Sequence, residues 1–348
     1  MSGSGKEDIP FMEKVVFSHL GRRSGRTRVR PGTGFDNGVV SVGGGRVMIL
    51  TSDPVSAIPS FGMELSAWLS VHLIASDYTS SGCDPEFALF TYNFPAKMDR
   101  SEREEYVSVV GDECGRLGVT IAGGHSGSYP GGGFTVIGSG TMLGFADERS
   151  YVTPAMARAG DAILMTKQAG IEATISLATA FPRTVEARAG AKLASAARGM
   201  VSLCSTVADA RAARKAGLGA GGLSSMHDAT EGGVLGALAE MASASQKQFV
   251  VYPEKIPVAA ATVAVCRAFG LDPLATMGEG ALLITCDPSA VPRIRRELRG
   301  LHIDCAEIGW VREGEGLQVG SGARAKRVTA GRDRYWEAYA KGVGRKLT

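Results

Sequence analysis

The first 150 residues alternate between stretches with strand-like and helix-like spacing of apolar positions. Apolar runs at 39–42 and 47–50 flank three consecutive glycines, which predicts a β-hairpin whose second strand ends at Asp53. Residues 63–79 carry apolar side chains on several sides, as a well-buried helix does. Further strands are predicted at 87–94, 119–122 and 134–144, and an amphipathic helix at 100–117. The first half therefore combines a sheet with two helices.

The second half continues the mixture of strands and helices. Strands are predicted at 161–166, 248–252, 280–286 and 302–311, with a further strand ending at 226–228. Helices are predicted at 171–180, 184–216, 232–243, 258–269, 288–299 and 333–340. The segment 151–154 is typical of a hinge, so we expect two domains, residues 1–150 and residues 151–348. This order of elements predicts an α/β fold, or a mixed α+β fold, with two lobes of similar size.

The composition favours a folded globular chain. Of the 348 residues, 44% are hydrophobic and 21% are charged, so the chain has enough apolar surface for a sizeable core. The formal net charge of +3 is too small to indicate nucleic acid as the main partner. A local cluster of arginines predicts either a solvated basic arm or an arm that folds over polyphosphate: Arg22, Arg23, Arg26, Arg28 and Arg30.

The cysteines form no pattern typical of metal binding or of a disulfide framework. They are Cys83, Cys114, Cys204, Cys266, Cys286 and Cys305, and none belongs to a C-x-x-C pair. A zinc site and a set of disulfides are therefore not expected. No apolar run resembles a signal peptide or is long enough to span a bilayer, so we expect a cytoplasmic protein without a membrane partner.

Three aspartates in the first half stand at turn-like ends of predicted elements. Asp36 follows the Pro31–Gly34 turn, Asp53 ends the hairpin strand, and Asp77 lies at the end of the buried helix. Carboxylates in such places suit Mg²⁺, which takes oxygen ligands and shares them with the phosphates of a substrate. The alternative is that each aspartate only caps a helix or starts a turn.

The segment Gly123-Gly124-His125-Ser126-Gly127-Ser128 is predicted to be a glycine-rich loop. Its backbone N–H groups and hydroxyls could cradle an anion such as a phosphate. It is neither a Walker loop, because no Gly-Lys-Ser/Thr follows, nor a Rossmann loop between a strand and a helix. A plain tight loop remains an equal alternative.

In the second half, residues 227–233 read His-Asp-Ala-Thr-Glu-Gly-Gly and lead directly into a predicted helix. Asp228 or Thr230 could cap that helix, and the helix N-terminus with its glycines would favour an anionic substrate. His227 and Asp228 could also act as acid and base. The alternative is a capping box at Thr230 without any catalytic role.

Taken in order, these motifs resemble the aminoimidazole-ribonucleotide synthetase (PurM-like) superfamily, on its HypE-like side. The resemblance covers about residues 15 to 340 and is carried by the ordered set of motifs rather than by any one of them. The matching segments are Pro31–Val40 (PGTGFDNGVV), 51–54, 76–77, 122–126, 154–172 and 227–233.

The resemblance implies a two-domain PurM-like fold with an N-terminal sheet domain that forms a homodimer and a C-terminal α/β domain. It implies ATP and Mg²⁺ as cofactors. By match of motif, Mg²⁺ and the ATP phosphates would be held by Asp36, Asp53 and Asp77, and the nucleotide would be contacted by Gly123, Gly124, His125 and Ser126. Asp228 and Thr230 would face the acceptor, beside His227.

The activity implied is the activation of an amide, carbamoyl or similar oxygen through phosphorylation by ATP, with an unidentified acceptor. The alternatives are a small-molecule kinase of the thiamine-monophosphate kinase type and a non-catalytic nucleotide-binding assembly subunit. Two departures keep the assembly-subunit alternative open: Asn37 follows Asp36 where the family often has a second acid, and no cysteine follows Cys305. A thiocyanate-forming reaction on the chain's own tail is therefore not expected. Nor is selenophosphate synthesis, because no cysteine precedes Cys83.

Overall fold

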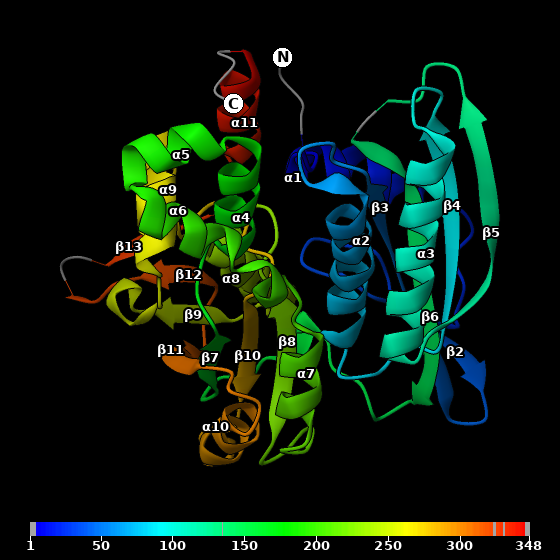
Figure 1. The fold of residues 1–348 in the computed structure, drawn as a ribbon. Helices are drawn as coiled ribbons and strands as arrows, with labels where there is room; N and C mark the ends of the chain where they lie inside the picture. The colour runs from blue at the N-terminus through cyan, green and yellow to red at the C-terminus, as the bar shows by residue number, and fades with distance from the viewer. Residues whose placement is uncertain (1–4, 134, 323–324, 330, 345–348) are drawn as a thin grey trace. The chain divides into compact units, whose positions relative to one another are not determined.

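The computed structural model describes residues 5–133, 135–322, 325–329 and 331–344 (Figure 1). The chain divides into two compact units. Unit 1 comprises residues 1–24, 31–35 and 152–348, and unit 2 comprises residues 25–30 and 36–151. The chain leaves unit 2 between Tyr151 and Val152, and the N-terminal residues belong to the same unit as the second half of the chain.

Unit 2 is built on a six-stranded sheet with the strand order β1-β2-β3-β6-β4-β5. Its strands are β1 (Thr27–Val29), β2 (Gly38–Gly43), β3 (Arg46–Ser56), β4 (Phe87–Pro95), β5 (Thr120–Tyr129) and β6 (Val136–Asp147). Neighbouring strands pair antiparallel except β4 and β5, which are parallel because helix α3 (Arg100–Leu117) connects them. The predicted hairpin is formed by β2 and β3, with Gly44 and Gly45 at the positive φ that such a turn requires.

Two long helices, α2 (Gly62–Thr79) and α3, lie side by side against this sheet, at the positions that the sequence predicts (Figure 1). Helix α3 begins at a capping box made by Asp99 and Glu102. It ends at Gly118, whose φ of 83° is left-handed. Helix α2 is buried along most of its length because it packs against α3, β3 and β6.

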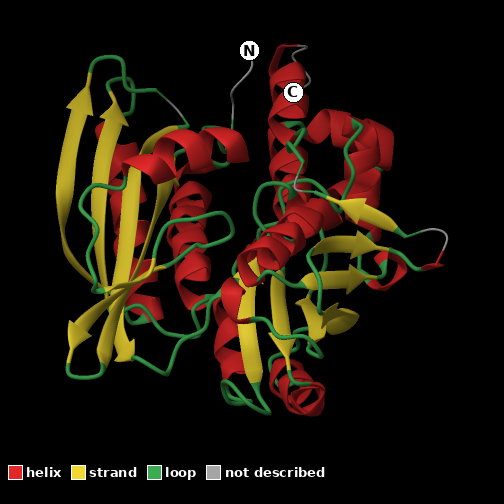
Figure 2. Cartoon of the chain, turned by 180° about the vertical axis from the view of Figure 1, so that it is seen from behind, coloured by secondary structure: helices red, strands yellow, loops and turns green. Residues whose placement is uncertain are grey.

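The alternation of side chains separates the two faces of the unit 2 sheet. The face covered by the helices carries the core, which includes Val47, Ile49, Ala88, Phe90 and Met142. The other face carries apolar side chains that are only partly buried or exposed, among them Met48, Leu50, Phe87, Leu89, Leu143 and Phe145. Figure 2 shows this second face from the front, with α2 and α3 behind the strands.

Unit 1 is built on a seven-stranded sheet with the order β13-β12-β9-β11-β7-β10-β8. Its strands are β7 (Ala162–Thr166), β8 (Leu223–Asp228), β9 (Gln248–Val251), β10 (Leu282–Cys286), β11 (Cys305–Arg312), β12 (Gly316–Val319) and β13 (Lys326–Val328). Neighbours pair antiparallel except β9 and β12. Strands β7, β8 and β10 are buried at every position, which fits a sheet that is covered on both faces, and β7 and β10 show the near-continuous apolar runs typical of such strands.

Helices cover both faces of the unit 1 sheet. On one face, α8 packs Val234, Leu238 and Met241 against β7 and β10. On the other face, α7 and α10 bring in Ala210 and Ile294. The α-helices of this unit are α1 (Ile9–Phe11), α4 (Ile171–Ala180), α5 (Pro182–Ala189), α6 (Ala191–Arg198), α7 (Val207–Arg214), α8 (Gly233–Ser245), α9 (Ala260–Phe269), α10 (Val291–Arg299) and α11 (Tyr335–Gly344). None of the helices in the described ranges is long and apolar enough to cross a membrane.

Several segments differ from the sequence prediction. The stretch 123–129 continues strand β5 and is not a loop. Strand β3 runs on to Ser56, so Asp53 lies inside it rather than at its end. The short helices at 9–19 and the strands β12 and β13 were not predicted, because each is too short to show a period of its own.

Candidate functional site

The structure brings the end of α2 to the start of β2, and with them two of the predicted metal-binding aspartates. The Asn37 side chain donates from Nδ2 to the Asp77 carbonyl oxygen at 2.7 Å and to Ser80 Oγ at 3.1 Å. Ser80 Oγ donates to the same Asp77 carbonyl at 2.7 Å and lies 3.5 Å from Asp36 Oδ2. The Asp36 carboxylate and the main-chain carbonyl of Asp77 therefore belong to one hydrogen-bonded group in unit 2.

Asp53 lies on strand β3, on the same face as a residue that contacts this group. It shares a face of β3 with Thr51, the face that α2 covers, because side chains two apart in a strand point the same way. Thr51 Oγ1 donates to the Asp36 carbonyl oxygen at 2.8 Å. The side chain of Asp53 is half-buried.

A glycine on the strand next to Asp53 leaves room for helix α2 to come close to the sheet. Gly140 of β6 pairs with Asp53, and a Cβ on Gly140 would lie 2.5 Å from Ile74 Cδ1. Asp77 follows Ile74 by three residues, which places both on one side of α2. The three aspartates thus come from a turn, a strand and a helix that meet on one side of the sheet.

Asn37 stands where a second acid was expected from the family pattern, and the structure gives it a bridging role. Its side chain is 8% exposed, and its amide nitrogen holds α2 as described above. Its amide oxygen Oδ1 is buried and has no hydrogen-bond partner in the described part of the chain. A buried oxygen without a partner, next to carboxylates, fits a hard cation such as Mg²⁺.

The predicted glycine loop is instead an exposed edge strand. In β5, residues Gly123, Gly124, His125 and Ser126 pair in parallel with Leu89 to Tyr92 of β4. Part of the backbone that was expected to form an anion nest therefore pairs with β4. Gly124 is required because a Cβ there would collide with the Phe90 carbonyl oxygen. His125 Nε2 lies 2.7 Å from the hydroxyl of Tyr129.

In unit 1, His227 and Asp228 end strand β8 and are almost fully buried, with 1% and 0% exposure. His227 Nε2 lies 3.1 Å from Glu240 Oε2 on α8. His227 Nδ1 lies 3.9 Å from Asp228 Oδ1. The imidazole is thus held between two acidic side chains, and Glu240 is a partner that the sequence analysis did not identify.

The turn after Asp228 does not use the predicted cap. Helix α8 starts at Gly233, its N-cap is Gly232, and no side chain caps it, so neither Asp228 nor Thr230 has that role. Both glycines have positive φ, and a Cβ on Gly233 would lie 2.6 Å from the Thr276 carbonyl oxygen. The chain closes tightly here because it has no side chains at these two positions.

Asp333 takes the place of the missing cap from far along the chain. Its Oδ2 accepts a hydrogen bond from the Gly232 N–H at 3.0 Å, and its Oδ1 accepts from Thr276 Oγ1 at 3.2 Å and from the Tyr335 N–H at 2.8 Å. Burial raises the pKa of Asp333, and these hydrogen bonds oppose the rise. Its separation of 101 residues from Gly232 explains why local sequence patterns did not reveal it.

Glu240 is charged because of its neighbours. Burial alone would raise the pKa of its carboxyl group, but the hydrogen bond with His227 and the ammonium group of Lys6 outweigh burial and lower the pKa to about 2. Lys6 Nζ lies 3.2 Å from Glu240 Oε1. Glu240 therefore carries a negative charge at neutral pH and is paired on both of its oxygens.

A second buried ion pair in unit 1 lies outside the predicted site. Lys167 Nζ donates to Asp209 Oδ2 at 3.0 Å and to the carbonyl oxygens of Leu203 and Ser205 at 3.1 and 2.7 Å. The two side chains are 9% and 1% exposed. Burial lowers the pKa of Lys167, and Asp209 opposes that effect. Lys167 also has a left-handed φ of 54°, which is uncommon for a residue with a side chain.

Two curated proteins with clear sequence similarity are both carbamoyl dehydratases HypE. The protein from Bradyrhizobium diazoefficiens is 36% identical over 99 residues, which is 28% of this chain and 29% of that protein. The protein from Rhizobium leguminosarum bv. viciae is 28% identical over 287 residues, which covers 80% of this chain and 77% of that protein. The longer match extends the likeness over most of both chains.

Solved structures share the fold. A structure of hydrogenase maturation protein HypE in complex with ATP has a TM-score of 0.65 at 18% identity and covers 93% of this chain and 92% of that one. A structure of AaThiL complexed with AMPPCP and TMP also has a TM-score of 0.65, at 21% identity, and covers 84% of this chain and 90% of that one. These identities are low, so the two structures speak for the fold.

Family models cover both halves of the chain. Residues 34–146 match the N-terminal domain of AIR synthase related proteins, and residues 158–321 match the C-terminal domain. The first range contains the three aspartates of unit 2, and the second contains the buried His227 and Asp228. The chain therefore belongs to the AIR synthase related family, with an N-terminal and a C-terminal domain of that family in their usual order.

Proposed function

We propose that this protein is an ATP-dependent enzyme that activates a carbamoyl or similar amide oxygen by phosphorylation, with Mg²⁺ as its metal ion. The observation that carries the proposal is the group formed by Asp36, Asp53 and Asp77 on one side of the unit 2 sheet, with the unpartnered oxygen of Asn37 beside it. The carbamoyl substrate class comes from the similarity to carbamoyl dehydratases HypE.

The carboxylates of Asp36, Asp53 and Asp77 would hold Mg²⁺, with Asn37 Oδ1 as a further oxygen ligand. When bound, the ion would neutralise charge on the ATP phosphates. Gly123, Gly124, His125 and Ser126 are proposed to contact the nucleotide, through an exposed edge strand rather than a loop. The exposed backbone and the polar side chains of this strand suit such a contact.

The acceptor is proposed to meet the residues of unit 1. A carboxamide nitrogen must lose a proton when its oxygen gains the phosphoryl group, and Asp228 is the proposed base for that proton. His227 is proposed to help to position Asp228, because its Nδ1 lies 3.9 Å from Asp228 Oδ1. The hydroxyl of Thr230, at the start of the tight turn, would contact the acceptor.

The first test is ATP binding measured by calorimetry with and without Mg²⁺. We expect binding to depend on Mg²⁺, and the substitution Asp53→Asn to weaken it more than about tenfold, about 1.4 kcal/mol, because a neutral amide is a poorer ligand for the ion. The matched control is Asp112→Asn, since Asp112 is exposed on α3. Absence of ATP binding by the unaltered protein, or equal binding by Asp53→Asn, would overturn the proposal.

Product analysis separates the proposed activity from the alternatives. Phosphate release with a panel of carbamoyl and carboxamide compounds is expected for the proposed enzyme. A stable phosphorylated product would indicate a small-molecule kinase of the thiamine-monophosphate kinase type, the class suggested by the shared fold with AaThiL. Tight ATP binding without either product would indicate a nucleotide-binding assembly subunit.

We also propose that the chain forms a homodimer through the uncovered face of the unit 2 sheet. That face has partly exposed apolar side chains on neighbouring strands, including Leu50, which pairs with Leu143. Leu89 on β4 is 40% exposed. An apolar sheet face of this kind is typical of a protein–protein interface.

Introducing a charge into that face is expected to dissociate the dimer. In Leu89→Asp, a carboxylate would have to be buried without a partner, so we expect the dissociation constant to rise about 100-fold or more. Sedimentation velocity over a concentration series measures it. Leu301→Asp is the control, because Leu301 is 49% exposed in unit 1 and should leave the assembly unchanged. A monomeric unaltered protein would contradict this proposal.

A further inference from the structure

The N-terminal segment reaches the proposed acceptor site of unit 1 through a single lysine. Residues 5–8 belong to unit 1, although most of that unit begins only at residue 152. Lys6 Nζ lies 3.2 Å from Glu240 Oε1, and the other oxygen of Glu240 lies 3.1 Å from His227 Nε2. Lys6, Glu240 and His227 thus form a continuous chain of polar contacts from the surface to the buried imidazole.

The same segment also contacts the turn that follows Asp228. The backbone N–H of Lys6 donates to Glu231 Oε2 at 2.7 Å, while the indole N–H of Trp336 donates to Glu231 Oε1 at 3.0 Å. Gly5 has a φ of 99°, and a side chain there would collide with Trp336 and Glu231. The Glu231 carboxylate therefore joins residues from both ends of the chain to one turn.

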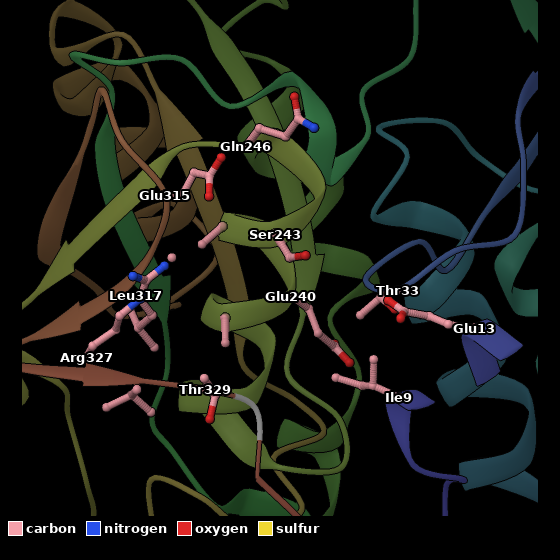
Figure 3. Close-up of a pocket in the computed structure, with 14 residues that line it drawn as sticks. Ile9, Glu13, Thr33, Glu240, Ser243, Gln246, Glu315, Leu317, Arg327 and Thr329 are labelled. Atoms are coloured by element: carbon pink, nitrogen blue, oxygen red, sulfur yellow. The ribbon is translucent and has the colours of Figure 1, made fainter. Parts of the chain in front are cut away.

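A cavity adjoins the N-terminal segment. A cavity of about 410 Å³ lies between it, the C-terminal half of α8 and the β12–β13 hairpin. Figure 3 shows Glu240 extending from α8 toward Ile9, with Thr33 and Glu13 on the same side of the cavity. The segment thus borders open space at Ile9 and Glu13, a few residues after the contacts of Lys6.

We infer that Lys6 and Glu240 are positioning residues, and that docking of the N-terminal segment through Lys6 fixes the Glu240 carboxylate, the His227 imidazole and the turn 228–233. This inference rests on the proposed role of His227 and Asp228 at the acceptor. Neither Lys6 nor Glu240 needs to touch the substrate, since each acts through the residue that it contacts.

Removal of the lysine alters a buried charge rather than a surface one. The Glu240 side chain is 8% exposed, whereas that of Lys6 is 49% exposed. Without Lys6, one oxygen of the carboxylate loses its partner, and the carboxylate can regain a partner only by moving toward water or by drawing His227 with it. Either movement disturbs the geometry at the end of β8, where Asp228 follows His227 directly.

The experiment compares Lys6→Met, Lys6→Arg and Glu240→Gln with Lys14→Met in the full chain. Lys14 is an exposed lysine of the same segment and serves as the matched control. Hydrogen exchange followed by mass spectrometry reports on peptides covering 5–20 and 228–240. We expect Lys6→Met to accelerate exchange in both peptides about fivefold or more, because local opening follows the loss of its closing contacts. Lys6→Arg should restore the protection, and Lys14→Met should not differ from the unaltered protein.

A spectroscopic readout separates positioning of His227 from general loosening. In protein labelled at histidine, the ring resonances of His227 are assigned by their loss in His227→Gln. We expect Lys6→Met and Glu240→Gln to shift these resonances, while those of His72, His125 and His302, which lie outside the N-terminal segment, stay unchanged. Unchanged His227 resonances and unchanged exchange at 228–240 in Lys6→Met would overturn the inference.

Turnover provides the last readout and keeps the two proposals distinguishable. If phosphate release is observed, Lys6→Met should lower kcat about tenfold and leave ATP affinity unchanged, as expected when geometry at the reacting group is lost. If the unaltered protein releases no phosphate with any carbamoyl compound, the proposed function fails. The exchange and resonance measurements then still decide whether Lys6 positions His227.

Discussion

The substitution Asp228→Asn is expected to lower the rate of phosphate release about 100- to 10,000-fold, the range typical of losing a general base. Asp228 is fully buried at the end of β8. The substitution replaces one carboxylate oxygen by an NH₂ group and removes the negative charge. An amide keeps the volume but cannot accept the proton that a carboxamide nitrogen gives up. Because Asp228 is not one of the proposed ligands of Mg²⁺ or ATP, ATP affinity should change less than about twofold.

The measurement is single-turnover phosphate release at saturating ATP, with ATP affinity determined separately by calorimetry. Asp304→Asn is the control, because Asp304 is an exposed aspartate of the same unit. A variant Asp228→Asn that turns over at the rate of the control would exclude Asp228 as the base. A variant that loses ATP affinity to the same extent as turnover would instead place Asp228 at the nucleotide.

The substitution Lys167→Met is expected to reduce the free energy of unfolding by about 3–5 kcal/mol, the usual effect of removing one partner from a buried ion pair. Asp209 is 1% exposed and would be left with an uncompensated charge. The carbonyl oxygens of Leu203 and Ser205 would also lose their donor, since Lys167 Nζ bonds both. The effect belongs to stability and not to chemistry, because this pair is outside the proposed site.

Urea denaturation followed by circular dichroism measures this change. The double variant Lys167→Met/Asp209→Asn should recover part of the loss, since it removes the unpaired charge as well. Lys215→Met, at an exposed lysine after α7, should remain within about 0.5 kcal/mol of the unaltered protein. An unfolding free energy for Lys167→Met within that same range would show that the pair contributes no net stability.

Much of the fold could be predicted because its long elements have strong local signals. The helix α3 starts at a capping box and ends at a left-handed glycine, so both of its ends are encoded within a few residues. The buried strands β7 and β10 are short apolar runs between turns, and both were predicted close to their observed bounds. In these cases the information needed to place an element lies inside the element.

The glycines at 123–127 show where that local information misleads. Consecutive glycines are typical of a loop. Here, however, Gly124 is needed so that β5 can approach the backbone of β4. That requirement comes from strand β4, an earlier part of the chain, in which Phe90 pairs with Gly124. A spacing argument along the chain does not contain this partner.

The candidate site was predicted only in its local parts. His227 and Asp228 could be identified because they are adjacent to each other and open a short motif that ends in Gly232 and Gly233. Glu240 was missed because it lies in the apolar helix α8 as an isolated acid, and its partner Lys6 is 234 residues away. Asp333, which takes the place of the predicted cap, is equally remote from Gly232. Side chains that support a site from a distance have no signature in the motif that they support.

The membership of the N-terminal residues in unit 1 has a consequence for biosynthesis. A ribosome produces residues 5–24 before unit 2, and the rest of unit 1 from residue 152 onward only after unit 2. Unit 2 can fold while the earlier segment waits with Phe11, Val15 and Leu20 exposed, side chains that remain about two-fifths exposed even in the finished protein. Closure of that long loop should therefore be a late step of folding, and the acceptor site would become complete only after the second part of unit 1 has been made.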